Sequence, residues 1–152
     1  MSINFDNFKH LVRISGKDIR GDKHVVNGLT MIRGIGPRMA DIVLKKAKIK
    51  PDTFIGLLTD AQVDKLDEII KDPIKFGVPR WFVNHVKDRN SGKDIHLVGS
   101  NLALYDRNDI DRLKKLRSYR GVKHAVVHKV RGQRTKSTGR GGRSIGVSRK
   151  KT

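Results

Sequence analysis

The side chains best suited to chemistry in this sequence are cationic, and they concentrate at one end of the chain. Residues 112–152 hold fifteen of the 34 Lys and Arg residues and none of the 15 Asp and Glu residues. A dense field of one sign is unfavourable for an isolated protein unless a partner of opposite sign neutralises it. The spacing therefore predicts that this segment binds a polyanion, and nucleic acid is the first class to consider.

Two motifs in this segment interleave basic residues with glycine and neutral hydrogen-bond donors. They comprise Arg117, Tyr119, Arg120, Gly121, Lys123 and His124, then Arg131, Gly132, Gln133, Arg134, Thr135 and Lys136, with Arg140 and Arg143 beyond. The planar fork of arginine suits phosphates and base edges. Tyr119 or His124 could stack on a base, and we expect Gly121 and Gly132 to let the backbone approach a sugar–phosphate strand. The alternatives are a solvated basic linker or a generic tether to a membrane or another polyanion, but the interleaving favours a shaped contact.

A second candidate site is Gly34-Ile35-Gly36, which lies between two stretches of helical periodicity. An aliphatic residue between two glycines predicts a helix–hairpin–helix in which Ile35 points inward and the next helix directs free N–H groups at a phosphate. Arg33 and Arg38 flank this position, and a side chain at Gly36 is expected to cost both packing and affinity. A plain helix stop is the alternative, although the basic context and small Ala40 favour phosphate binding.

Patterns typical of enzymes, metal sites or membrane spans are absent from the sequence. There is no GxSxG, HExxH, GxxxxGK[ST] or complete GxGxxG pattern, and there are no cysteines. His124 and His128 have no third ligand nearby, and no apolar run approaches the ~20 residues of a transmembrane helix. We therefore expect no catalytic residues, metal, cofactor, small-molecule substrate or membrane partner.

Two further clusters are interpreted as structural. Asp64, Asp67 and Glu68 share one predicted helix and are expected to form its solvated face. Trp81 and Phe82 are expected to be packing residues, with base stacking as the alternative.

Hydrophobic periodicity predicts a mainly helical fold with a long extended basic C-terminal tail. The predicted elements are an extended stretch at 8–14, a loop at 16–21, helices from Asp22 to Ile32, Pro37 to Lys48 and Thr59 to Pro73, a helical piece from Pro79 to Val86, a strand pair near Ile95 and Leu97, and a helix at 105–120 that ends at Gly121. The side chains expected to form the apolar faces of these helices are Val25, Val26, Leu29, Ile32, Met39, Ile42, Val43, Val63, Leu66, Ile69, Ile70, Ile110, Leu113 and Leu116. This suggests a body at 1–121, least defined at 73–104, and a tail at 122–152.

These residues together resemble the universal small-subunit ribosomal protein thirteen family. The resemblance rests on Arg13-Ile14-Ser15-Gly16, Lys23-His24, Leu29-Thr30, Gly34-Ile35-Gly36, Tyr119-Arg120-Gly121-x-Lys123-His124 and Val130 to Lys136. The middle segment with Pro79 and Trp81-Phe82, and the ending at 138–148, are similar to the archaeal and eukaryotic branch of that family.

The resemblance implies a cytoplasmic, ribosome-bound protein in the head of the small subunit. Its body, with a helix–two-turns–helix arrangement, would bind small-subunit ribosomal RNA through residues that include Lys23 and His24. Its tail would approach transfer RNA near the decoding region, with Ser148, Arg149, Lys150 and Lys151 nearest to it. Further implied partners are small-subunit protein nineteen and large-subunit components at a head bridge.

Two other functions use the same features of the sequence. A DNA-repair enzyme would account for a helix–hairpin–helix, but no set of catalytic residues is assignable. A DNA-packaging protein would account for the charge, although the interleaved Arg, Gly and polar donors favour RNA.

Overall fold

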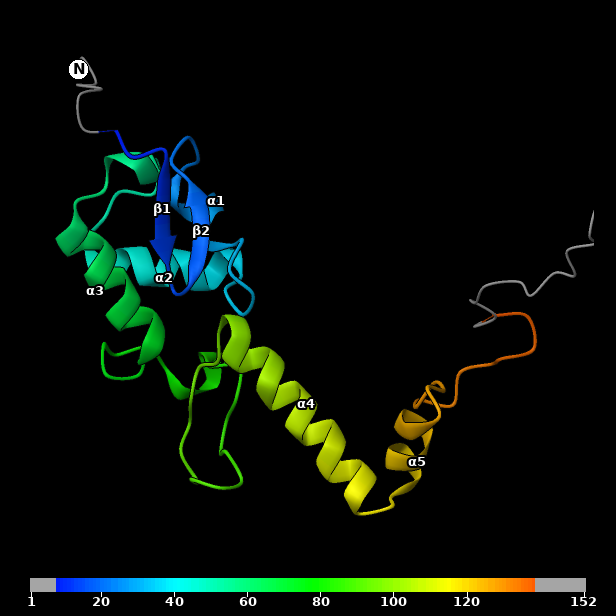
Figure 1. Ribbon diagram of the computed structural model, residues 1–152. Coiled ribbons are helices and arrows are strands. Elements are labelled where there is room, and N and C mark those ends of the chain that lie inside the picture. The colour runs from blue at the N-terminus through cyan, green and yellow to red at the C-terminus, as the bar shows by residue number, and fades with distance from the viewer. Residues whose placement is uncertain (1–7, 139–152) are drawn as a thin grey trace, which may run out of the picture. The chain divides into compact units, whose positions relative to one another are not determined.

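The computed structural model describes residues 8–138 of the chain. The chain divides into two compact units, the first reaching Asp106 and the second starting at Arg107. The described residues form five α-helices, two short 3₁₀ helices and one two-stranded sheet, so the fold is mainly helical as predicted (Figure 1). Within these residues, no helix has the length and apolarity that crossing a membrane requires.

The first unit opens with a β-hairpin made of β1 (Leu11–Ile14) and β2 (Lys17–Arg20), which pair antiparallel. Ser15 and Gly16 connect them with positive φ angles of 47° and 77°, the conformation that two-residue hairpin turns favour. The prediction of an extended segment is confirmed for β1. The predicted loop at 16–21 is wrong, because Lys17–Arg20 form strand β2. Its sequence did not indicate a strand, since Ile19 is its single apolar side chain and the alternation is weak.

Helix α1 (Val25–Leu29) is shorter than its apolar pattern suggested. Asp22 is not its cap: the residue before the helix is His24, and no side chain caps the first turn. Ile32 is buried as predicted, but it lies in the turn after the helix. An apolar side chain three residues past a helix end keeps facing the core when the chain continues as a tight turn.

Helix α2 (Pro37–Ala47) begins with proline at its first position, which confirms the prediction. Met39 and Val43 are buried and Ile42 is half-buried. Leu44 is also buried, so the apolar face of α2 is wider than the predicted one. The lysines of its last turn point to solvent, where they complement the negative end of the helix dipole.

Helix α3 (Asp60–Lys71) starts with the predicted capping box. The Gln62 N–H donates to Thr59 Oγ1 over 3.4 Å, and the Thr59 N–H donates to Gln62 Oε1 over 3.1 Å. These two bonds satisfy donors that the helix cannot satisfy itself. Pro73 follows two residues after the helix and prevents its continuation.

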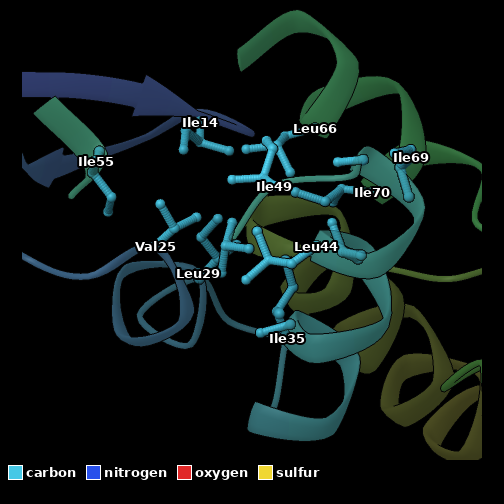
Figure 2. Close-up of a cluster of buried hydrophobic side chains, with 14 of the residues drawn as sticks. Ile14, Val25, Leu29, Ile35, Leu44, Ile49, Ile55, Leu66, Ile69 and Ile70 are labelled. Atoms are coloured by element: carbon cyan, nitrogen blue, oxygen red, sulfur yellow. The ribbon is translucent and has the colours of Figure 1, made fainter. Parts of the chain in front are cut away.

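The hydrophobic core of the first unit lies between the hairpin and helices α1 to α3 (Figure 2). Ile55, in the 3₁₀ helix η2 (Ile55–Leu57), and Ile49 fill the connection between α2 and α3. The labelled side chains converge from every layer and are Ile14, Val25, Leu29, Ile35, Leu44, Ile49, Ile55, Leu66, Ile69 and Ile70. Because all are aliphatic, burial of apolar area rather than polar networks stabilises this core.

Side chain-to-backbone hydrogen bonds organise the segment between α3 and α4. The Asn84 side chain donates to the Leu97 carbonyl over 2.7 Å and accepts from the Leu97 N–H over 2.8 Å. Next to it, His85 and Ile95 form one antiparallel β-bridge, so the predicted strand pair reduces to that bridge. The predicted helical piece is the single 3₁₀ turn η3 (Arg80–Phe82).

The prediction of one helix at 105–120 is wrong. The structure has α4 (Gly99–Lys115) and α5 (Tyr119–Ala125), separated by a break in which Arg117 takes a left-handed φ of 50°. Ser118 explains the restart, because its hydroxyl accepts from the Gly121 N–H over 3.1 Å and caps α5. Ser118 therefore divides a stretch whose periodicity looks continuous. The apolar face predicted there is not buried, because Ile110 and Leu113 are half-buried and Leu116 is 64% exposed.

Candidate nucleic-acid interface

The two glycines in the turn before α2, Gly34 and Gly36, are glycine for different structural reasons. Gly34 has a φ of 100°, and a Cβ added to it would lie 2.5 Å from the Leu97 carbonyl oxygen. Gly36 has an ordinary φ of −91°, and a Cβ added there would meet no protein atom within 4 Å. Gly34 is therefore required by packing inside the first unit. The expected packing cost of a side chain at Gly36 is wrong, and only an external ligand would need that space.

The N-terminus of α2 is open to solvent. Gly36 occupies the cap position without a side-chain cap, and Gly36, Pro37 and Arg38 are all exposed. The first N–H groups of an α-helix lack partners within the helix, and the helix dipole places partial positive charge there. Ile35 is buried beneath the turn, as predicted, and it holds the turn against the core. This geometry suits an anionic group such as a phosphate.

The two arginines beside the hairpin are not equivalent. Arg33 Nη2 lies 2.8 Å from Asp106 Oδ2, so its charge has a partner within the first unit. Arg38 is exposed and forms no ion pair with the described residues. Arg38 is therefore the cation that remains available to a ligand at the start of α2. Arg33, which was also predicted to bind RNA, already has a carboxylate partner in Asp106.

Lys23 and His24 precede α1 and are held by local contacts. The His24 ring stacks on Phe54 with centroids 4.6 Å apart, and its Nδ1 lies 2.9 Å from the Asp52 carbonyl oxygen. Lys23 Nζ lies 3.3 Å from Met31 Sδ, which draws the lysine toward the turn that precedes the hairpin. The fold thus brings Lys23 toward the turn before α2 and fixes the exposed His24 through its ring contacts.

In the second unit, the predicted role of Gly121 is wrong. Gly121 lies inside α5 and is buried, and an added Cβ would clash with the Leu113 carbonyl group. The glycine is needed for packing of α5 against the end of α4 and cannot approach a sugar–phosphate strand. Gly132 differs, because its φ is 70° and nothing lies within 4 Å of an added Cβ. Only Gly132 is consistent with close approach to a ligand.

The exposed face of α5 presents an aromatic ring beside a cation. Tyr119 is 72% exposed, and Lys123 Nζ lies 5.3 Å from the centre of its ring. Arg120 is exposed on the same helix, and His124 is half-buried near its end. The pairing keeps the tyrosine ring at the surface, where a base could stack on it.

Residues 131–136 are exposed, and none of them forms an ion pair within the described residues. A cavity of about 490 Å³ lies between this stretch and α5. Its lining contains basic and neutral polar side chains and no carboxylate, and comprises Tyr119, Lys123, His128, Lys129, Gly132, Gln133, Thr135 and Thr138. A cavity of this composition suits a phosphate or a nucleotide.

Several predicted positions lie outside the described residues. These are Arg140, Arg143, Ser148, Arg149, Lys150 and Lys151, which all belong to the stretch after 138.

The clustered polar side chains that the structure does show are structural. Asp88 is buried and accepts hydrogen bonds from the Ser91 N–H and hydroxyl over 2.9 and 2.8 Å, and it lies 3.3 Å from His85 Nε2. The Ser91 hydroxyl bond is the main cause that lowers the pKa of Asp88. The hydroxyl donates to a carboxylate whose lowered pKa makes it a weak base, and His85 contacts the other carboxylate oxygen rather than the hydroxyl. Residues 8–138 contain no group of three metal-ligating side chains.

Three other predictions about side chains are settled by burial. Asp64 and Glu68 are exposed as expected, but Asp67 accepts from the Ser15 N–H over 2.8 Å and ties the hairpin turn to α3. Phe82 packs against the core as predicted. Trp81 does not: it is 77% exposed. Sequence patterns alone missed this because neighbouring aromatic residues in a tight turn cannot both face inward.

Comparison with known proteins returns one family. The family described as Ribosomal protein S13/S18 matches residues 13–141 of this chain. Small ribosomal subunit protein uS13 of Hyperthermus butylicus is 45% identical over 144 residues, which cover 95% of each chain. The protein of the same name from Saccharolobus solfataricus is 48% identical over 95% of this chain and 87% of its own. That of Methanothermobacter thermautotrophicus is 44% identical over 96% of this chain and 98% of its own.

Proposed function

Since this chain belongs to the ribosomal protein S13/S18 family and is a structural, non-enzymatic component of the small ribosomal subunit, we propose that it binds small-subunit ribosomal RNA through two separate surfaces. The family and its archaeal relatives assign the chain to the ribosome, and so to the cytoplasm. The first surface is the open start of α2 with Gly36 and Arg38. The second is the basic face of α5 together with 131–136.

The observation that carries this proposal is that the exposed cations of 131–136 have no carboxylate partner within the described residues. Residues 131–136 form no ion pairs with the described residues, and no Asp or Glu occurs from 112 onward. Such a surface gains free energy from phosphates that release counterions. The α2 surface adds a small site of fixed geometry, because its N–H groups are held by the helix rather than by a flexible chain.

The finer contacts are proposed from the family resemblance. We assign the functional tail to 122–152 and the RNA-binding body to 1–121, and we place Ser148 to Lys151 nearest transfer RNA. Small-subunit protein nineteen and large-subunit components at a head bridge are the proposed protein neighbours. Fully extended, the ~27 residues that follow α5 would reach ~90 Å, which is sufficient for contacts far from the body.

Sedimentation of a cell extract followed by crosslinking tests the proposal. The chain should co-migrate with small subunits and crosslink to their RNA through 131–136. A variant with Arg131, Arg134 and Lys136 replaced by Gln should crosslink weakly, whereas Gln at Lys45, Lys46 and Lys48 removes equal charge from the outer face of α2 and serves as its control. Co-migration with chromosomal DNA would contradict the proposal.

Binding of the isolated chain to ribosomal RNA should depend steeply on salt. Roughly six to ten phosphate contacts correspond to a log–log slope between about −4 and −9. A slope near zero would show that phosphate contacts are not the source of affinity.

A further inference from the structure

Trp81 is the single tryptophan of the chain, and the fold leaves it uncovered. In the turn η3, Phe82 packs against the core while Trp81 remains 77% exposed. The two rings meet edge to face, with centroids 5.5 Å apart and planes at 70°. This contact positions the indole without burying it. Packing a tryptophan removes about 150–250 Å² from water, so the fold forgoes a large stabilising contribution at this residue.

The residue preceding Trp81 lines a cavity of about 390 Å³ with a cationic wall. The cavity lies between the end of α3, Arg80 and the stretch 92–96. Its charged side chains are the four cations Lys71, Lys75, Arg80 and Lys93 and the two carboxylates of Asp72 and Asp94. The cavity wall is therefore positive overall.

The carboxylates are already engaged within the fold. Asp72 lies 2.6 Å from Lys75 Nζ. Asp94 accepts from the Lys87 N–H over 2.8 Å and lies 3.9 Å from Arg80 Nε. Lys71 and Lys93 form no ion pair with the described residues, although both line the cavity. Lys71 and Lys93 thus remain available to an anionic ligand in the cavity, whose lining includes Arg80, the residue before Trp81.

Resting on the proposed function, we propose that Trp81 stacks against an unpaired base of small-subunit ribosomal RNA while Lys71 and Lys93 hold the adjoining phosphates. Aromatic rings beside cations are the usual elements of single-stranded RNA sites, because every base has a flat face and every nucleotide has a charge. Protein docking surfaces instead have an apolar centre built from several residues. In the described stretch 71–98, only Trp81 and Val86 are exposed large hydrophobic residues. An exposed indole whose preceding residue lines a cationic cavity therefore favours RNA over a protein partner.

The fluorescence of Trp81 reports on this site alone, since the full-length chain has no other tryptophan. Titration with a short single-stranded oligoadenylate should quench the emission in a saturable manner, and a duplex RNA of equal length should not. The Lys71→Gln/Lys93→Gln variant should raise the concentration for half-maximal quenching severalfold, whereas Lys45→Gln/Lys46→Gln should leave it unchanged. Unchanged emission while a labelled oligoadenylate binds elsewhere on the chain would overturn the inference.

Photocrosslinking in ribosomes separates the possible partners. The full chain with p-benzoylphenylalanine in place of Trp81 should co-sediment with small subunits and crosslink to their RNA. The same group in place of Leu11 serves as the positional control, because Leu11 is 66% exposed on strand β1. Crosslinks from position 81 to protein alone would overturn the inference and leave the proposed function intact. A chain that fails to join small subunits would overturn both.

Discussion

Gly34 packs against Leu97 so closely that an added Cβ would lie 2.5 Å from the Leu97 carbonyl oxygen and 3.2 Å from the Val98 Cα. The turn before α2 is thereby held by the segment that leads into α4. Gly34 also has a φ of 100°, which a residue with a side chain could adopt only with backbone strain. Two positions later, Gly36 has neither constraint. The hairpin motif therefore combines one glycine needed by the fold with one that leaves space for a ligand.

Serine substitutions at the two glycines should separate stability from binding. Gly34→Ser should destabilise the protein by about 1–3 kcal/mol, because it adds left-handed strain to a clash. Gly36→Ser should leave stability unchanged or slightly higher, since serine is a good N-cap, yet weaken RNA binding by occupying the N–H groups of α2. Denaturant unfolding and filter binding measure the two effects. Equal stability losses would contradict the distinction.

The arginines that flank the hairpin should differ in RNA binding. Arg38→Gln should weaken binding and reduce the salt slope by about 1, because one phosphate contact is lost. Arg33→Gln breaks an exposed ion pair with Asp106, which contributes about 0–1 kcal/mol to stability, and should leave the slope nearly unchanged. Binding measured across a salt series provides both slopes. A loss of slope in the Arg33 variant alone would refute the assignment.

Val127 should be a site of stored backbone strain. It takes a left-handed φ of 56° just past α5 and is 90% exposed, although β-branched residues avoid this conformation. Val127→Gly should stabilise the end of α5 by about 1 kcal/mol. The His128 N–H, which donates to the Lys123 carbonyl over 2.9 Å, should then exchange about fivefold more slowly in hydrogen-exchange experiments.

A matched change at the preceding residue provides the control for this prediction. Val126 has an ordinary φ of −93°, so Val126→Gly should bring no such gain. Equal exchange rates in the Val127 variant and the unmodified chain would show that no strain is released.

His96 should make stability depend on pH. Burial lowers the pKa of His96 from its ordinary 6.5, and the Gly34 backbone opposes this shift in part. Below pH 6.5 the unfolded chain therefore binds more protons than the native state. The contribution of neutral His96 to the free energy of unfolding is therefore complete above that pH and decreases as the pH falls below it. Unfolding free energies across mildly acidic pH should show this slope, and His96→Gln should flatten it; an unaltered slope would exclude His96 as the source.

Deletion of 139–152 should leave the first unit folded. Every buried hydrophobic residue that the structure describes lies between Val12 and Leu97. The truncated chain should keep its thermal midpoint while ribosomes that contain it translate less well. A large drop in the midpoint would show that the removed residues contribute to folding.

Features determined by neighbouring residues were predictable from the sequence. Pro37 at the start of α2, the Thr59–Gln62 capping box and the inward Ile35 depend on contacts a few residues apart. The concentration of charge after residue 111 is likewise a property of composition. The family follows from the resemblance of whole motifs and from the family match, which also need only the sequence. Local preferences and charge counts need no knowledge of how distant segments meet.

Features that depend on distant segments were decided by the tertiary structure. The sequence alone determined a mainly helical chain, its basic end and its family. Only packing revealed that Gly121 faces the Leu113 carbonyl, that Arg33 pairs with Asp106, and that Trp81 stays exposed while Phe82 packs against the core. The physical reason is that a side chain's partners are set by the whole fold. A glycine or an arginine has the same letter whether the space beside it is filled by its own chain or left for RNA.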